Sequence, residues 1–402
     1  MTKTFLCVSC YFKGVAFLQA CKSDGHRVLL VTSATLKDQN WPWDSIDDVF
    51  YMQENEEGLW NNQDLIKALA HLMRTTKIDR VIALDDFDVE RAALIREEFR
   101  IPGMGQTTAR YFRDKLAMRI QARDGGIPVP PFSALFNDNE INDFCSRIPS
   151  PWVVKPRSEA SATGIKKILD IHQLWEVLNG IGDRRNQYLI EQFLPGDVYH
   201  VDALSYESKN IFLRSSRYLN TPFEVAHAGG IFRTMTLAET DPIHKDLEVI
   251  NQKLMAVFGM MHGASHSEYI RSLEDNSFYF LETSSRVGGA HIAEMVEAAS
   301  GLNLWKEWAH IETALIHGSR YKLPPTTHRL AAAIISLARF QDPDDSQFDD
   351  PEIWWRMHKE YHIGFIFQSD NQQRILKLLE DYGNRIANDF HAAIEAPARS
   401  SH

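Results

Sequence analysis

The stretch Ser265-His266-Ser267-Glu268-Tyr269-Ile270, followed by Phe280-Leu281-Glu282-Thr283-Ser284-Ser285-Arg286, carries two acidic residues on two short runs that are typical of strands. The polar segment between the two runs predicts the end of one strand, a turn and the start of the next. If the loop consists of residues 274–276, with Asn276 in the left-handed region, Leu273 faces Ser277. The same register then places Glu268 opposite Glu282.

Two carboxylates on one face of a hairpin have Cβ atoms roughly 5 Å apart and repel each other, so they need a bound cation or a shared proton. Mg²⁺ suits the pair because it takes few protein carboxylates and completes its shell with water and phosphate oxygens. At period two, Ser284 and Arg286 follow on the same face and add a neutral oxygen and a positive charge. The alternative is a solvated hairpin with scattered charges.

The composition is that of an ordinary globular protein. The chain has 402 residues, of which 44% are hydrophobic and 24% charged, and this predicts two or three domains. A net charge of −11 argues against a general binder of nucleic acids or anionic membranes. No apolar run has the length of a membrane span, and the first residues do not resemble a signal peptide, so we expect a cytoplasmic protein. Cys7-Val8-Ser9-Cys10 lies within a predicted strand and is interpreted as core, with a redox or metal role as the alternative.

The first hundred residues alternate predicted strands and helices. Strands at residues 5–10, 27–32 and 80–84 and helices at 15–23 and 64–74 have the rhythm of a parallel, doubly wound sheet. Asp85-Asp86 lies at the carboxyl end of the third predicted strand, where such sheets bind ligands, and it also suits the start of the next helix. No glycine-rich dinucleotide fingerprint follows the first strand.

Three further segments suit nucleotide binding. Val153-Val154-Lys155-Pro156 is a strand that ends in a lysine and precedes a loop of small residues, and both can contact phosphates. Ile190-Glu191-Gln192-Phe193-Leu194-Pro195-Gly196 is a strand and turn whose backbone could face an adenine edge. Arg113-Asp114-Lys115 begins a helix. Each segment also has a plain structural reading as a solvated lysine, a turn or an exposed helical charge.

In this order the segments resemble the ATP-grasp superfamily, over about residues 5–314. The resemblance implies an α/β and α+β fold in four parts. An N-terminal Rossmann-like domain at 1–105 precedes two α+β subdomains, at 106–190 and 191–320, that clasp ATP. A C-terminal α+β extension follows at 321–402. It also implies that Lys115 and Lys155 hold ATP phosphates, and that Arg286 steadies the transferred phosphoryl group. The remaining implied residues are Glu191, Gln192, Phe193 and Leu194 at the adenine, and Glu268, Glu282 and Ser284 at magnesium. Val198 stands where the family usually has a ribose ligand, so either Asp197 substitutes or the contact is absent.

Within the superfamily, Gly288-Gly289-Ala290-His291-Ile292 and the helix after it resemble the carboxylate–amine ligases, most nearly the L-amino-acid ligases. That branch implies substrate contacts at Glu224, His227, Gly288 and Gly289. Glu224 and His227 can equally be polar loop residues, and Gly288-Gly289 can serve only as a turn. Ser284 replaces the usual Asn, and Ser158, Ala160 and Ser161 replace glycines of the phosphate flap.

The expected activity is therefore an ATP-dependent carboxylate–amine ligase that forms ADP through an acyl-phosphate, with an amino acid on at least one side. Its cofactor would be Mg²⁺, as one or two ions that Mn²⁺ could replace, and its partners would be small molecules, with no nucleic acid or membrane. Homodimers are common among similar proteins. Two alternatives are an ATP-grasp ligase or carboxylase for another small metabolite, and a protein that binds ATP without turnover.

Overall fold

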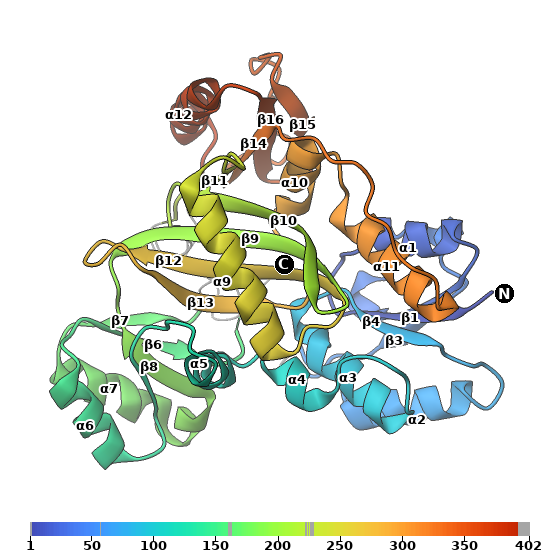
Figure 1. Ribbon diagram of the computed structural model, residues 1–402, viewed down its shortest axis with the longest axis horizontal. Coiled ribbons are helices and arrows are strands. Elements are labelled where there is room, and N and C mark those ends of the chain that lie inside the picture. The colour runs from blue at the N-terminus through green and yellow to red at the C-terminus, as the bar shows by residue number, and fades with distance from the viewer. Residues whose placement is uncertain are drawn as a thin grey trace.

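The computed structural model describes residues 2–56, 58–159, 163–221, 223, 225 and 229–392. Its strands form three sheets, and Figure 1 shows the large sheet between the amino-terminal sheet and a small second sheet. This arrangement confirms the predicted combination of α/β and α+β units. Among the described residues no helix combines the length and apolar character that a membrane span requires.

The amino-terminal sheet has parallel strands in the order β3-β2-β1-β4. They are β1 (Thr4–Ser9), β2 (Arg27–Ser33), β3 (Asp48–Met52) and β4 (Arg80–Ala83), with helices α1 (Val15–Ser23), α2 (Asn62–Leu72), α3 (Val89–Glu98) and α4 (Gln106–Arg110). Short 3₁₀ turns are η1 (Ala34–Leu36), η2 (Trp43–Ser45) and η3 (Asp86–Asp88). The sequence predicted three of the strands and missed β3, because this edge strand pairs only with β2 and has no buried apolar run.

The small second sheet is antiparallel, in the order β5-β8-β6-β7. Its elements are β5 (Phe132–Ala134), β6 (Trp152–Pro156), β7 (Lys166–Ile168) and β8 (Tyr188–Gln192), with α5 (Lys115–Asp124), α6 (Asp138–Arg147), α7 (Ile171–Ile181) and η4 (Gly182–Gln187). Trp152, Val154 and Ile190 pack in one apolar cluster with residues of α6 and α7. Because side chains alternate along a strand, Lys155 and Glu191 lie on the other face.

The large sheet has the order β13-β12-β9-β10-β11-β14-β16-β15. Its strands are β9 (Gly196–Tyr206), β10 (Lys209–Tyr218), β11 (Phe232–Thr236), β12 (Gly263–Ser272), β13 (Phe278–Ser284), β14 (Leu330–Leu337), β15 (Ile353–Arg356) and β16 (His362–Ser369). Its helices are α9 (Pro242–Phe258), α10 (Ile292–Ser300), α11 (Leu304–His317) and α12 (Gln372–Asp389). Since β11 pairs with β14, the strands after residue 321 extend the sheet that carries Glu268 and Glu282. The predicted boundary between residues 190 and 191 falls within β8.

One apolar core joins the amino-terminal sheet to the large sheet. Val8 and Ala83 of the parallel strands belong to the same buried cluster as Tyr199 of β9 and Phe258 of α9. The carboxyl end of β4, with Asp85 and Asp86, is thereby fixed next to the large sheet.

The β12–β13 hairpin corrects one prediction and confirms another. Ser272 donates its N–H to the carbonyl of Ser277 at 3.0 Å, so the loop has the four residues 273–276 and not three. Asn276 has the expected left-handed conformation, with φ 58°. A bulge at Leu281 then restores the register, because Tyr269 pairs with Phe280 while Glu268 pairs with Glu282. The facing glutamates are therefore confirmed, although the predicted loop was one residue too short.

Candidate active site

A cavity of about 1660 Å³ lies where the three sheets meet. Most of the predicted site residues line it: Lys115, Lys155, Glu191, Gln192, Phe193, Leu194, Glu268, Glu282, Ser284, Arg286, Gly288 and Gly289. Asp197 is not among the lining residues, and its carboxylate pairs with Arg217 Nη2 at 2.8 Å. Glu224 and His227 lie outside the described residues.

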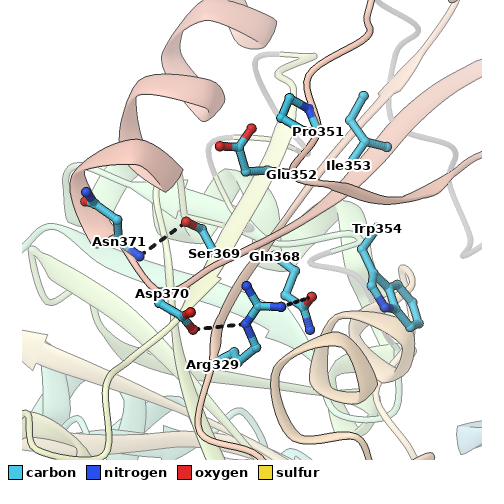
Figure 2. A pocket seen from close by; sticks show the side chains of 9 residues that line it. All are labelled: Arg329, Pro351, Glu352, Ile353, Trp354, Gln368, Ser369, Asp370 and Asn371. Atoms are coloured by element: carbon cyan, nitrogen blue, oxygen red, sulfur yellow. Dashed lines mark hydrogen bonds and ion pairs between the residues drawn. The ribbon is translucent and has the colours of Figure 1, made fainter.

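A second, smaller cavity of about 440 Å³ lies beside β15, β16 and the start of α12 (Figure 2). Arg329 in this cavity donates from Nε to the Asp370 carboxylate at 2.9 Å and from Nη1 to the Gln368 side chain at 2.5 Å. None of the predicted site residues lines this cavity. The candidate active site is therefore the larger cavity.

The two glutamates of the hairpin have separate partners. Lys115 Nζ lies 2.8 Å from a Glu282 carboxylate oxygen and also donates to the carbonyl of Glu159 at 2.6 Å. Burial acts to raise the pKa of Glu282, but Lys115 and Lys155 together lower it overall. Glu268 accepts a hydrogen bond from Tyr218 Oη at 2.8 Å. Each glutamate of the pair thus has its own partner, and Lys115 supplies a nearby positive charge.

Lys155 forms a buried ion pair with Glu191, and Arg119 Nε donates to the same carboxylate at 2.9 Å. Burial and Arg119 lower the pKa of Lys155 to about 8, although Glu191 opposes them. Arg119 also donates to the carbonyl of Leu281, the bulged residue of β13. Sequence reasoning gave Arg119 no role, yet it joins the predicted adenine strand to the hairpin of the two glutamates.

The predicted adenine segment runs from β8 into the turn before β9. The N–H of Gln192 donates to Pro131 at 2.8 Å, and that of Phe193 donates to Pro151 at 3.0 Å. These two donors are therefore engaged by neighbouring loops, and the Leu194 N–H is the next donor along the segment. Lys167 Nζ lies 3.8 Å from the centre of the Phe193 ring, which is a cation–π distance.

Asp86 connects the amino-terminal sheet to the hairpin. Its carboxylate accepts a hydrogen bond from Ser284 Oγ and lies 3.7 Å from Arg113 Nη1 and 3.9 Å from Arg286 Nη2. Burial acts to raise the pKa of Asp86, but the two arginines lower it to about 2. The neighbouring Asp85 accepts from the N–H of Phe87 and caps η3. Asp85 thus caps a 3₁₀ turn and not the predicted helix, whose N-cap is Asp88, while Asp86 lines the cavity.

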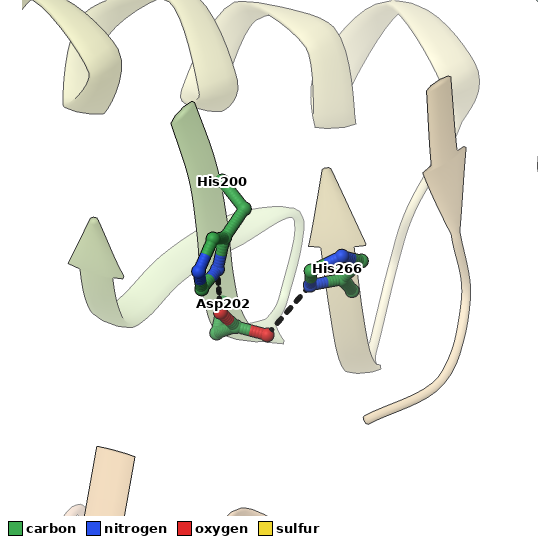
Figure 3. A group of neighbouring side chains, drawn as sticks. All are labelled: His200, Asp202 and His266. Atoms are coloured by element: carbon green, nitrogen blue, oxygen red, sulfur yellow. Dashed lines mark hydrogen bonds and ion pairs between the residues drawn. The ribbon is translucent and has the colours of Figure 1, made fainter. Parts of the chain in front are cut away.

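His200, Asp202 and His266 form a buried network that the sequence did not predict (Figure 3). His200 Nδ1 and His266 Nδ1 contact different oxygens of Asp202, at 2.7 and 2.9 Å. His266 Nε2 lies 3.6 Å from Glu268, and despite burial, Asp202 and Glu268 raise the pKa of His266 to about 9. Each oxygen of Asp202 is therefore engaged by one histidine.

Gly288 packs against the same network. A Cβ atom at Gly288 would lie 2.7 Å from an Asp202 oxygen and 3.1 Å from His266 Nδ1, whereas one at Gly289 would meet nothing within 4 Å. Ala290 and His291 follow with φ of 50° and 56°, a left-handed pair at the start of α10. Non-glycine residues in this conformation are strained and often lie at ligand sites. The period-two placement of His200 and Asp202 on β9 was the available sequence signal for the network.

No family model matches the chain. Among curated proteins it is 25% identical over 250 residues to an L-arginine-specific L-amino acid ligase of Bacillus subtilis, covering 60% of each chain. It is also 25% identical over 215 residues to a D-alanine–D-alanine ligase of Ralstonia pickettii, covering 52% of this chain and 65% of that one. The match spans less than two thirds of either relative.

Solved structures match the fold of nearly the whole chain. An L-amino acid ligase from Bacillus licheniformis has a TM-score of 0.77 at 16% identity, covering 97% of this chain and 98% of that one. N5-carboxyaminoimidazole synthetase from Staphylococcus aureus, complexed with ADP, has a TM-score of 0.70 at 14% identity, covering 95% and 98%. At such identities the likeness establishes the fold, including the region after residue 320.

Proposed function

The chain has the ATP-grasp fold, and from this premise we propose that it is an ATP-dependent ligase that joins a carboxylate to an amine and releases ADP. The single observation that carries the proposal is the convergence of two lysines, two facing glutamates and Arg286 on one cavity. A protein that only binds ATP has no need of an arginine placed for phosphoryl transfer.

We propose that Lys115 and Lys155 bind the ATP phosphates and that the segment from Glu191 to Leu194 borders the adenine. In the structure both lysines are paired with acidic residues, Lys115 with Glu282 and Lys155 with Glu191. Each ammonium group is therefore already positioned at the cavity wall. Asp197, which points to Arg217, would have to exchange that partner before it could reach a ribose.

The donor set fits magnesium. Glu268 and Glu282 face each other in register, and the hydroxyl of Ser284 donates its proton to Asp86, which leaves oxygen lone pairs for a cation. When bound, magnesium would neutralise charge on the β- and γ-phosphates. The residues that would hold it are Glu268, Glu282 and Ser284.

In the proposed reaction a carboxylate oxygen of the first substrate attacks the γ-phosphorus, and the bond from that phosphorus to the oxygen that stays with ADP breaks. Arg286 stabilises the charge on the transferred group. The amine of the second substrate then attacks the acyl carbon, the carbon–oxygen bond to phosphate breaks, and the amine proton leaves with solvent or a base. Closure of the cavity would protect the acyl-phosphate from water.

We propose that at least one substrate is an amino acid, in line with the relatives named above. The turn at Gly288 and Gly289 would bind a substrate carboxylate, because it leads into the amino-terminal end of α10. Glu224 and His227 complete the proposed substrate contacts. We also propose a homodimer, as in the dimeric domain of a 2-oxoglutarate carboxylase with the same fold, and a cytoplasmic location, where ATP is available.

The test uses the purified protein with ATP, Mg²⁺ and pools of amino acids, and measures ADP and phosphate together with the mass of any new product. Stimulated ADP release with a condensed product is expected. Product formed from bicarbonate instead would favour a carboxylase, a chemistry found among the structural neighbours. ATP binding without ADP under any pool would contradict the ligase proposal.

Lys155 gives the proposal a pH dependence. Its pKa of about 8 in the free protein means that the ammonium group is lost as the pH rises through 8. If Lys155 binds phosphate, kcat/KM for ATP should fall about tenfold for each pH unit above this value. Lys155→Arg should move this limb to higher pH, since arginine stays protonated. A profile that is flat from pH 7 to pH 9.5 would exclude Lys155 from ATP binding.

A further inference from the structure

The far end of the cavity is walled by the segment that joins β15 to β16. Trp355, Met357, His358, Lys359 and His362 all line the cavity. The ring of Trp355 packs on that of His291, with centroids 4.4 Å apart. Because His291 follows Gly288 and Gly289 by only two to three residues, this wall lies next to the proposed binding place of the substrate carboxylate.

The wall is basic. His358, Lys359 and His362 contribute three basic side chains within five residues, and the one acidic residue among them, Glu360, is not a lining residue and accepts from Gln341 at 2.9 Å. Within the described ranges, the side chains of His358 and Lys359 form neither an ion pair nor a hydrogen bond. Their donors are therefore free to bind a ligand.

The basic groups also act on one another. His362 Nδ1 donates to the carbonyl of Glu360 at 2.7 Å, which fixes the ring, so Nε2 donates to a ligand only when the ring is protonated. Burial lowers the pKa of His362, and Lys359 and His291 lower it further, against the hydrogen bond to Glu360. A negative group bound beside Lys359 would instead favour the protonated His362 ring, whose Nε2 could then donate to that group.

Carboxylates that could recognise a basic ligand are few at this end. Glu294 lines the cavity, and its carboxylate lies 3.5 Å from His291 Nδ1. Glu159, on the segment after Lys155, lies next to the proposed phosphate site, because its carbonyl accepts from Lys115. The other lining carboxylates, those of Asp86, Glu191, Glu268 and Glu282, have the partners described above.

We propose that one of the two substrates carries an additional anionic group, a side-chain carboxylate or a phosphate, and that Lys359 binds it with His358 and His362. This inference rests on the proposed ligase function. It assigns the loop after β15, and with it the C-terminal extension, a part in substrate selection.

The experiment compares ADP release with anionic amino acids, neutral L-leucine and basic L-arginine, each supplied with the same set of second amino acids. L-Aspartate and L-glutamate test the carboxylate, and O-phospho-L-serine tests the phosphate. An anionic amino acid should give the highest kcat/KM. Lys359→Glu should lower that value about tenfold or more and raise the value for L-arginine.

Lys377→Glu is the matched control, because Lys377 is exposed on α12 and does not line the cavity. It should leave all values unchanged. ADP release that is greatest with L-leucine or L-arginine, or a Lys359→Glu variant with unchanged selectivity, would overturn this inference alone. Absence of ADP with every pair would overturn the ligase proposal and this inference with it.

Discussion

Glu282→Gln is expected to reduce ATP-dependent ADP formation roughly 100- to 1,000-fold while leaving the protein folded. Glutamine keeps the shape of the side chain and an oxygen that can accept from Lys115, which now lies 2.8 Å from the carboxylate. It removes the negative charge that faces Glu268 across the hairpin. A divalent cation would therefore lose one of its two proposed carboxylate ligands, and its apparent affinity should fall with the rate.

The measurement is initial ADP release over a range of Mg²⁺ concentrations, with thermal unfolding as the check on the fold. Glu274→Gln is the matched control, because Glu274 is exposed in the loop of the same hairpin. If Glu282→Gln and Glu274→Gln have equal activity, the carboxylate pair is only a solvated feature of the hairpin, and the magnesium proposal fails.

The hairpin of the facing glutamates has some features that could be predicted from the sequence and others that could not. The polar turn and the left-handed Asn276 were predictable from local chemistry. The loop length was not, because Leu273 could end the strand or enter the loop with similar local preference. Local chemistry did not predict the bulge at Leu281 either, and the carbonyl of this residue accepts from Arg119, which lies 162 residues away in the chain.

In the rest of the site, too, local segments were predictable and contacts between distant segments were not. Lys115, Lys155 and Glu191 were found because each lies in a short segment with its own pattern, and the order of the segments is informative. Asp202 and His200 were missed because their partners, His266 and Thr234, come from other strands of the large sheet. Asp86 was noticed as a ligand-edge residue, but its contact with Ser284 exists only after two sheets have packed together. Contacts between distant segments are what a single sequence leaves open.

Both lysines proposed to bind phosphate have a carboxylate partner, Glu282 for Lys115 and Glu191 for Lys155. Each lysine would share or exchange that partner when it contacts a phosphate. Breaking one partner from a buried pair is unfavourable unless another charge replaces it. We therefore expect ATP and magnesium to bind better together than either does alone.

Arg286→Ala is expected to lower ADP formation about 1,000-fold or more, with little change in ATP affinity. Arg286 is largely buried, donates from Nη1 to the carbonyl of Val287 at 2.9 Å, and has Nη2 at 3.9 Å from Asp86. These contacts fix the guanidinium at the cavity wall without using all its donors, since Nε has no hydrogen-bond partner among the described residues. Arg286→Lys should restore only a small part of the rate, because an ammonium group lacks the planar fork that binds two oxygens.

The rate of ADP formation and the affinity for ATP should respond differently to Arg286→Ala. Equilibrium binding of ATP to the Arg286→Ala variant should stay within about threefold of the unchanged protein, since the two lysines are intact. The rate of ADP formation by Asp86→Asn should lie between those of the unchanged protein and Arg286→Ala. Asparagine still accepts from Ser284 but no longer offers a charge to Arg286 and Arg113. Arg271→Ala, at the far end of β12, is the control and should keep full activity. Equal losses of rate and of ATP affinity in Arg286→Ala would make Arg286 a nucleotide-binding residue, and the proposed role in phosphoryl transfer would then be wrong.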